Sequence, residues 1–257
     1  MKVMVITSIS NEKVKLFRSL ASAKGRKEAG LYIAEGANLV KDIPLRDSVS
    51  TLFVKQSREE DFREITNRFP SAEKVVLSDE LFDRVSDTVT PAGIAALVKI
   101  PKSAELSDVF EDKIIVLDHL SDAGNVGAVL RTAVAAGYKT AILLGCADPY
   151  SPKAVRASMS AIFKIKICFS DNEAFLCSKN IVKYDIMVLD MMGENIFTHL
   201  PHGKYALVVG NEAHGVSSEI KSVGRKLSIP MQSMESLNAA VSAGVAMYIL
   251  ERNQFKQ

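Results

Sequence analysis

Apolar and polar positions alternate along the second half of the chain in blocks of two kinds. Short apolar runs predict six strands, at 114–118, 140–144, 164–168, 185–190, 205–209 and 226–230. Longer helix-like stretches between and after them predict helices at 126–137, 152–160, 172–181, 217–223 and 236–252. Repeated alternation of strand and helix indicates an α/β fold with a parallel sheet and helices on both faces. The near-continuous apolar strands fit a sheet that is covered on both sides.

The first hundred residues show a less regular pattern of the same elements. The expected elements are a helix at 11–28 and strands at 51–55, 74–77 and 93–100. A stretch with Pro101, serines and mixed charge then separates two apolar regions. The sequence therefore predicts a small α/β domain at 1–100, a linker at 101–112 and a larger domain at 113–257.

The charge of the chain is informative only locally. The formal net charge of +2 says little about partners, but every charged residue from Lys13 to Lys27 is basic. Such a stretch is either a solvated helix face or a contact for phosphates, whose counterions lysine and arginine release on binding. On the second interpretation, Lys24, Arg26 and Lys27 are candidate phosphate contacts.

The chain lacks the expected features of a membrane or secreted protein. No apolar run approaches the roughly 18 residues that a membrane-spanning helix needs, and the first residues do not have the pattern of a secretory signal. Three irregularly spaced cysteines are typical of reduced thiols. His199 and His202 have no matching Cys or His pair nearby, so we expect no metal site. We expect a cytoplasmic protein.

Three loops at the predicted carboxyl ends of the strands carry unusual residues, and ligands of such sheets bind at that edge. In the first loop, Gly124 and Gly127 permit a tight turn, and Asn125 offers both a donor and an acceptor. The helix that follows contains Arg131 as its one charged residue, with no acid three or four positions away. Its guanidinium either reaches water along its own stem or binds an anion at a cleft.

The other two loops contribute an acid and a short polar segment. Gly210 and Glu212 follow one strand, and the acid is either a partner for Arg131 or a cap of the next helix. Ser236 and Asn238 precede an uncharged stretch, which we expect to form a buried helix capped by Ser236. A partial match to G-x-G-x-x-G keeps a nicotinamide- or nucleotide-binding enzyme as an alternative.

Taken together, the loops resemble three motifs of the SpoU/TrmH family of RNA ribose 2′-O-methyltransferases, part of the SPOUT superfamily. The family's N-x-G-x-x-x-R-[TS]-A is similar to residues 125–133, its G-x-E-x-x-G to 210–215, and its I-P-M followed by S-L-N to 229–231 and 236–238. The stretch 151–163 also resembles a family segment. The first domain, with Glu35-Gly36 and the run 90–98, looks like the RNA substrate-binding domain that precedes many of these enzymes.

The resemblance implies S-adenosylmethionine as methyl donor, a ribose 2′-hydroxyl of RNA as acceptor, a C-terminal trefoil knot, and a homodimer formed through the methyltransferase domain. The catalytic residues implied are Arg131, Asn125, Glu212, Ser236 and Asn238. The cofactor-binding residues implied are Gly210, Ile229 and Leu237. The substrate-binding residues implied are Lys24, Arg26, Lys27 and Arg156.

Arg131 is assigned as the catalytic base by analogy within the family, but a guanidinium does not give up its proton in proteins. Binding the adjacent phosphate and stabilising the developing alkoxide is the physically easier role. The loop between Met231 and Ser236 departs from the family pattern because it has no glycine and is one residue short. Ribosomal RNA is the expected substrate. Transfer RNA, or a non-catalytic RNA-binding protein on the same scaffold, are the alternatives.

Overall fold

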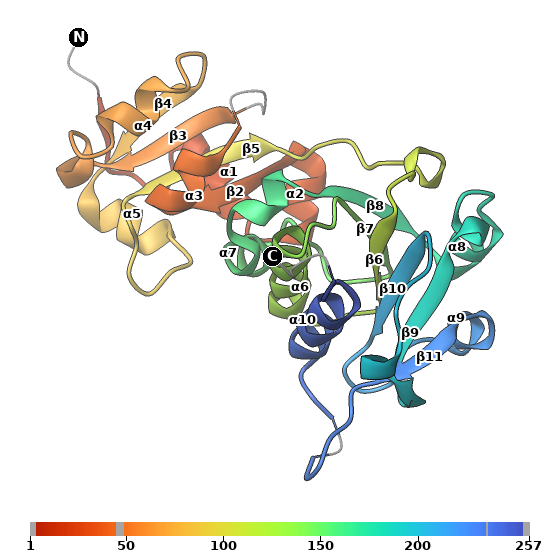
Figure 1. Cartoon of the computed structure of the whole chain (residues 1–257). Helices are drawn as coiled ribbons and strands as arrows, with labels where there is room; N and C mark the ends of the chain where they lie inside the picture. The colour runs from red at the N-terminus through yellow and green to blue at the C-terminus, as the bar shows by residue number, and fades with distance from the viewer. Residues whose placement is uncertain (1–3, 45–48, 235, 254–257) are drawn as a thin grey trace. The chain divides into compact units, whose positions relative to one another are not determined.

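The computed structural model describes residues 4–44, 49–234 and 236–253, and within them the chain forms two compact units. Unit 1 comprises Met1–Pro101 and Tyr150–Phe163, and unit 2 comprises Lys102–Pro149 and Lys164–Gln257, each as far as the described residues extend. Each unit is built around one sheet (Figure 1). None of the described helices is long and apolar enough to cross a membrane.

Unit 1 holds a mixed sheet of five strands in the order β1-β4-β3-β5-β2. The strands are β1 (Val5–Ile6), β2 (Leu31–Glu35), β3 (Val49–Lys55), β4 (Glu73–Leu77) and β5 (Ile94–Lys99). Strands β1, β4 and β3 run parallel, whereas β5 runs antiparallel to both β3 and β2. The helices are α1 (Glu12–Ser19), α2 (Ala23–Ala29), α3 (Ala37–Asp42), α4 (Arg63–Asn67), α5 (Asp79–Val85) and α7 (Pro152–Ser158). The expected small α/β domain is thus confirmed.

The single helix predicted at 11–28 is wrong, because the segment forms two helices with a break between Ser19 and Ala23. The hydroxyl of Ser22 accepts a hydrogen bond from the N–H of Gly25 at 3.0 Å and so begins α2. Gly25 permits this turn, since a Cβ there would lie 2.0 Å from the carbonyl oxygen of Ser19. In α1, Phe17 is buried and packs edge-on against Phe53 of β3, with ring centroids 5.0 Å apart.

Helix α7 belongs to unit 1 by its packing, although the sequence placed this segment in the second domain. Arg156 of α7 donates to the carboxylate of Asp87 at 3.0 Å. Just before α7, the ring of Tyr150 lies 5.2 Å from that of Tyr32 in β2. These are tertiary contacts, and nothing in the local pattern of residues 150–163 encodes them.

Unit 2 holds six strands, all parallel, in the order β11-β9-β10-β6-β7-β8. The strands are β6 (Lys113–Asp118), β7 (Thr140–Leu144), β8 (Lys166–Ser170), β9 (Asp185–Asn195), β10 (Tyr205–Gly210) and β11 (Arg225–Ser228). The α-helices are α6 (Ala123–Ala135), α8 (Asn172–Cys177), α9 (Ser218–Val223) and α10 (Ala239–Leu250). Short 3₁₀ helices across both units are η1 (Gln56–Arg58), η2 (Leu106–Asp108), η3 (Met159–Phe163), η4 (Ile181–Lys183) and η5 (Ile196–Thr198). The predicted parallel α/β sheet is confirmed.

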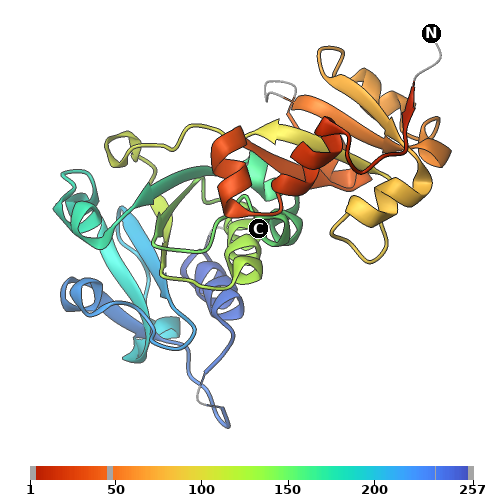
Figure 2. The same ribbon diagram turned by 180° about the vertical axis from the view of Figure 1, so that it is seen from behind.

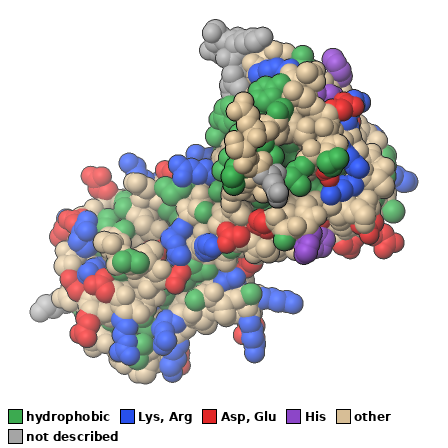
Figure 3. Space-filling model, turned by 90° about the horizontal axis from the view of Figure 1, so that it is seen from below, with side chains coloured by type: hydrophobic (Ala, Val, Ile, Leu, Met, Phe, Trp, Pro, Cys, Tyr) green, Lys and Arg blue, Asp and Glu red, His purple; other side chains and the backbone are tan. Residues whose placement is uncertain are grey.

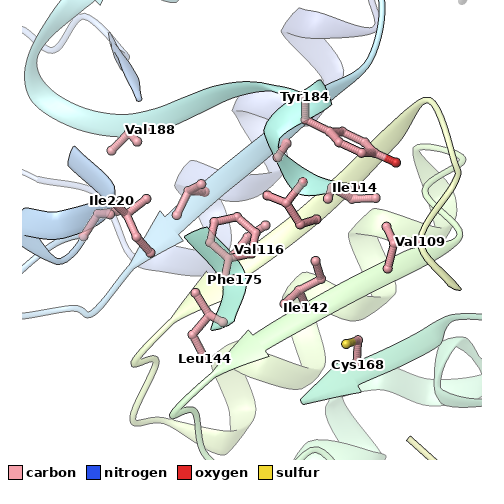
Figure 4. Close-up of a cluster of buried hydrophobic side chains, with 14 residues drawn as sticks. Val109, Ile114, Val116, Ile142, Leu144, Cys168, Phe175, Tyr184, Val188 and Ile220 are labelled. Atoms are coloured by element: carbon pink, nitrogen blue, oxygen red, sulfur yellow. The ribbon is translucent and has the colours of Figure 1, made fainter. Parts of the chain in front are cut away.

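Helices cover both faces of this sheet. Helices α6 and α10 lie side by side on one face, and α8 and α9 lie on the other (Figures 1 and 2). Phe175 of α8 and Ile220 of α9 join Val116, Ile142 and Val208 of the strands in one fully buried cluster (Figure 4). Burial of such side chains stabilises the fold by about 1.5–3 kcal/mol each, which explains why the strand residues are apolar on both faces.

The strand order reverses at β6 and β10, and this fixes where a ligand site forms. Strand β6 leads to β7 and β8 on one side, while β10, β9 and β11 lie on the other. The last register pair of the two strands is Asp118 with Gly210, so the loops that follow both strands leave the sheet side by side. In open parallel sheets, ligands bind beyond the carboxyl ends of the strands at such a switch point.

Candidate active site

The loops after β6 and β10 are joined by hydrogen bonds to one carboxylate. Glu212, two residues beyond β10, accepts from the hydroxyl of Ser121 at 3.1 Å and from its backbone N–H at 3.4 Å. Asn125, in the first turn of α6, donates through Nδ2 to Glu212 Oε1 at 2.8 Å. The first two predicted loops therefore meet at Glu212.

The third predicted loop joins the same group through Asn238. Its Nδ2 donates to Oδ1 of Asn125 at 3.0 Å, so Asn125 donates to the acid and accepts from the second amide. We call Ser121, Asn125, Glu212 and Asn238 the site network. The network connects the ends of β6 and β10 with the start of α10, three segments that are far apart in the sequence.

The carboxylate of Glu212 is held in its ionised form. Burial raises its pKa, but the hydrogen bonds from Asn125 and Ser121 lower it, and the sum lies below the ordinary value. Glu212 therefore carries a full negative charge at neutral pH. A carboxylate with a lowered pKa is a weak base and a strong hydrogen-bond acceptor.

A tight turn at 211–215 positions Glu212. Asn211 accepts through Oδ1 from the N–H groups of Ala213 and His214, at 2.9 and 3.1 Å, and its backbone pairs with that of Gly215. Gly215 has φ of 70°, which favours glycine. A Cβ on Gly210 would lie 2.2 Å from backbone atoms of Gly215, so no larger residue fits there. The turn that positions Glu212 therefore requires glycine at both 210 and 215.

Asp118 and His119 support the turn from β6, and sequence reasoning missed both. The buried carboxylate of Asp118 accepts from the N–H of Ser217 at 2.6 Å and contacts Nδ1 of His119 at 2.6 Å. The carbonyl of His119 accepts from Nδ2 of Asn211 at 2.8 Å. His119 adopts φ of 57°, a conformation that non-glycine residues rarely take. The signal in the sequence that could have found Asp118 is an acidic residue at the end of an apolar strand.

A pocket of about 700 Å³ opens beside the site network. Six residues expected from the sequence line it, namely Gly210, Glu212, Ile229, Ser236, Leu237 and Asn238. Its other walls include Val209, Leu227 and Met231, and the exposed pair Met191 and Met192, which sequence reasoning also missed. On the face of unit 2 seen in Figure 3, hydrophobic side chains gather around a hollow.

The lining also contains an ion pair between β9 and α9. Lys221 Nζ lies 2.9 Å from the carboxylate of Asp190, and both residues line the pocket. Burial raises the pKa of Asp190, but the hydrogen bond and charge of Lys221 help to lower it below its ordinary value. The acid therefore stays ionised at neutral pH. The pocket thus combines apolar walls with a neutralised pair and the exposed acceptor Glu212.

Arg131 lies outside this lining. It is exposed on α6, six residues after Asn125, and forms no hydrogen bond or ion pair with any residue that the structure describes. Glu212 is bound to Asn125 and Ser121, so it does not serve as a resting partner for Arg131. A free guanidinium on a helix otherwise made of small and apolar residues remains available to an anion.

Two local expectations about helix starts need correction. Asn238, not Ser236, caps α10: its Oδ1 accepts from the N–H groups of Ala240 at 2.9 Å and Val241 at 3.3 Å. An Asn side chain at the N-cap, directly before the first helical residue, satisfies these orphan donors as well as serine does. Gly124 and Gly127 lie inside α6 rather than in a turn before it, because Asp122 caps the helix by accepting from Asn125 N–H at 2.9 Å.

Among the basic candidates of unit 1, Arg26 is not available to a ligand. It is 3% exposed, and its guanidinium donates to the carbonyls of Leu20 and Ala21, at 2.8 and 3.0 Å. Arg26 satisfies carbonyls left free where α1 ends, which corrects its assignment as an RNA contact. Lys24 and Lys27 are exposed, with Lys24 at 3.8 Å from Glu28.

Two protein-family models match the chain, each over a different part of it. The model of the SpoU rRNA Methylase family matches residues 112–248, more than half of the chain. The chain belongs to the SpoU rRNA methylase family. A second model, the MRM3-like substrate binding domain, matches residues 11–96. This family member therefore carries a substrate-binding domain ahead of the catalytic fold.

Two relatives and one solved structure are similar to most of this SpoU family member. The 23S rRNA (guanosine(2553)-2'-O)-methyltransferase RlmP of Bacillus subtilis is 27% identical over 250 residues, which span 95% of this chain and 98% of that protein. The mitochondrial rRNA methyltransferase 3A of Danio rerio is 27% identical over 281 residues, 87% of this chain and 64% of that protein. The AdoMet-bound rRNA methyltransferase from Sinorhizobium meliloti has a TM-score of 0.86 at 25% identity, with 100% of both chains covered.

Proposed function

We propose that the protein transfers a methyl group from S-adenosylmethionine to a ribose 2′-hydroxyl of ribosomal RNA in the cytoplasm. The observation that carries the proposal is the site network, in which Asn125, Glu212 and Asn238 are hydrogen-bonded at the wall of the 700 Å³ pocket. Membership of the SpoU rRNA methylase family and the names of the relatives support the same activity.

The pocket suits S-adenosylmethionine in size and chemistry. Its volume lies within the range of about 300–1,000 Å³ that is usual for cofactor sites. Gly210, Ile229 and Leu237 would hold the donor through backbone groups and apolar contacts, and the AdoMet-bound structure of the relative from Sinorhizobium meliloti has the same fold. When bound, S-adenosylmethionine supplies an already activated methyl group, so the chain must mainly position the acceptor hydroxyl.

The residues of the site network would orient the ribose. Glu212, ionised and fixed by Asn125 and Ser121, offers an acceptor, and Ser236 and Asn238 offer hydroxyl and amide groups at the pocket wall. Arg131 would bind the phosphate next to the target ribose and stabilise the developing alkoxide. Because a guanidinium keeps its proton, Arg131 acts through charge and position.

A homodimer through unit 2 would bring Arg131 to a pocket. Helix α10 has no charged residue, yet Val241 and Tyr248 are 51% and 43% exposed on it. A helix that is apolar all round is usually covered. A second copy packed over α10 and α6 would cover both residues and bring the exposed Arg131 of one subunit toward the other subunit's pocket. The threaded trefoil knot, with the segment 229–238 passed through a loop, belongs to the same proposal.

Unit 1 would bind the RNA backbone through Lys24 and Lys27, whose side chains reach solvent. Replacing both by alanine should reduce the slope of log K against log salt by about 1–2, since each lost phosphate contact removes roughly 0.7–0.9. The matched control is replacement of Lys179 and Lys183, exposed lysines of unit 2, which should leave the slope unchanged. An unaltered slope in the first variant would make Lys24 and Lys27 solvated surface residues.

The decisive experiment is transfer from radiolabelled S-adenosylmethionine to RNA isolated from cells that lack this protein. We expect label in ribosomal RNA, released as a 2′-O-methylated nucleoside on digestion. Label in transfer RNA alone would mean that transfer RNA is the substrate and that the methyl-transfer chemistry is as proposed. RNA binding with no calorimetric signal for S-adenosylmethionine would leave a non-catalytic RNA-binding protein. A thermal shift with NAD and none with S-adenosylmethionine would favour a dehydrogenase.

A further inference from the structure

Unit 1 contains a cavity of about 200 Å³ that none of the activities above uses. Phe17, Ile33 and Val85 form its apolar wall, and its charged side chains are Arg18, Glu35, Asp87 and Arg156. All of these residues belong to unit 1, including Arg156 on α7. The cavity lies below the roughly 300 Å³ at which sites for drug-sized ligands begin, so it suits one flat ring system rather than a whole nucleotide.

Glu35 presents one unused carboxylate oxygen at this cavity. Its Oε1 accepts from the hydroxyl of Ser86 and from that of Thr88, the latter at 2.9 Å. Both bonds use the same oxygen, and within the described residues Oε2 has no hydrogen-bond partner. The two hydroxyls hold the carboxylate in one orientation, and Oε2 remains as an acceptor for a donor group that enters the cavity.

Two arginines supply positive charge at the same cavity. Arg18 is exposed in the last turn of α1 and forms no ion pair in the part of the chain that the structure describes. Arg156 donates to Asp87 at 3.0 Å, so this acid is neutralised within the lining. The cavity therefore pairs a ring-sized apolar wall and one directed acceptor with a free cation beside it.

We propose that this cavity binds one unpaired nucleobase of the substrate RNA that carries an exocyclic amino group. Proteins read single-stranded RNA by placing splayed bases against apolar and aromatic side chains and hydrogen-bonding their edges. A carboxylate accepts from an amino group such as N4 of cytosine, which uracil lacks. Arg18 contacts the phosphate beside the bound base. The inference rests on the proposed function, because it takes RNA as the substrate.

The test uses fluorescence anisotropy of the full chain with labelled eight-nucleotide homopolymers of adenosine, cytidine and uridine. The wild type should bind the adenosine and cytidine oligomers about 10-fold more tightly than the uridine oligomer, the value of one hydrogen bond to a charged group. Glu35→Gln keeps an oxygen for Ser86 and Thr88 and turns the free position into a donor. It should abolish the preference and favour uridine, which offers a carbonyl at that edge.

Glu64→Gln, an exposed acid of α4, makes the same charge change outside the cavity and should keep the wild-type preference. Ala21→Trp fills the mouth of the cavity from an exposed position and should lower the binding of all three oligomers to one common level. A lower melting temperature of Glu35→Gln with the base preference intact would overturn the proposal and leave Glu35 as a support of the segment 86–88.

Methyl transfer by the wild type, measured in parallel, separates this proposal from the proposed function. Transfer to ribosomal RNA together with equal binding of the three homopolymers overturns the base site alone. Absence of both transfer and oligomer binding overturns both. Transfer with the predicted preference, and loss of the preference in Glu35→Gln, supports the two together.

Discussion

Groups of polar side chains lie at both ends of the strand pair β6 and β10, and helix α10 joins the two groups. At the carboxyl ends lies the site network, which α10 enters through Asn238 at its start. At the amino ends lies a second group, Lys113, Tyr138, Tyr205 and Glu251, which we call the basal network. Glu251 follows the last residue of α10. The same helix is thus held at one end by exposed groups and at the other by buried ones.

The basal network is closed. Lys113 Nζ donates to Glu251 at 2.5 Å and to the carbonyl of Ala136 at 3.0 Å, and the hydroxyl of Tyr205 donates to the other oxygen of Glu251. The hydroxyls of Tyr138 and Tyr205 are 2.8 Å apart. Burial raises the pKa of both tyrosines, so they stay neutral. Since Glu251 is 3% exposed, its charge depends on these partners.

The site network is open by contrast. Glu212 is exposed, Asn125 is partly exposed, and each uses only part of its hydrogen-bonding capacity within the protein. An unused acceptor in water costs little, whereas a buried one costs about 1–3 kcal/mol. Polarity alone therefore does not identify a site: the buried network stabilises the fold, and the exposed one remains free to bind a substrate.

The strongest test of this contrast is Glu251→Ala. It leaves Lys113 partly buried without its carboxylate and should lower the free energy of unfolding by about 3–5 kcal/mol, measured by urea denaturation. Methyl transfer per folded molecule at low temperature should stay near the wild-type rate. The double replacement Lys113→Met with Glu251→Leu removes both charges and should recover most of the stability. A loss below about 1 kcal/mol in Glu251→Ala would place the basal network among ordinary surface contacts.

Arg131→Ala should have the next largest effect, and on rate instead of stability. Removing a preorganised positive group from a site of developing negative charge costs about 10²–10³ in kcat. Because Arg131 is exposed and forms no hydrogen bond or ion pair with a described residue, the unfolding free energy should change by less than about 0.5 kcal/mol. S-adenosylmethionine binding, followed by calorimetry, should persist. Full transfer by the variant would remove Arg131 from the mechanism, and Arg131→Lys should retain part of the rate.

Asn238→Ala should produce a smaller effect that touches both properties. The side chain caps α10 and donates to Asn125, so the variant should lose about 1 kcal/mol of stability and some transfer rate. Asn238→Ser keeps a capping oxygen but does not provide the amide donor. It should recover the stability, measured by denaturation, and leave the rate low. A wild-type rate in Asn238→Ser would mean that the bond to Asn125 has no part in the reaction.

The sequence predicted most of unit 2, because the apolar runs that form its strands are local features of the sequence. All six strands of the parallel sheet lie where apolar runs indicated them, and β7 has the predicted bounds. In unit 1 the two-residue β1 and the short β2 left no pattern long enough to detect. The break between α1 and α2 depends on the close approach of Gly25 to Ser19, which a periodic pattern does not encode.

Only part of the candidate site could likewise be predicted from the sequence. The meeting of Asn125, Glu212 and Asn238 followed from three motifs read together, since each residue alone had a structural explanation. The burial of Arg26 was hidden, because its acceptors are backbone carbonyls that become free only when α1 ends. The support from Asp118 was visible only as an acid after an apolar strand, and its partner Ser217 is 99 residues away.

Glu212 should show the smallest effect, in the pH dependence of stability. Its pKa in the folded protein lies below the ordinary value of about 4.5, so it contributes stability that is fully present above that pH and is lost as the pH falls through the lowered pKa. Glu212→Gln should flatten the fall in unfolding free energy below about pH 4.5. The change should stay below about 1 kcal/mol because the carboxylate is exposed.

Glu219→Gln, which makes the same change at another exposed acid of unit 2, is the control. An identical pH profile for wild type and Glu212→Gln would show that the hydrogen bonds from Asn125 and Ser121 do not outweigh the cost of burying the charge, and the open network would then be held together by Asn238 and Asn125 alone.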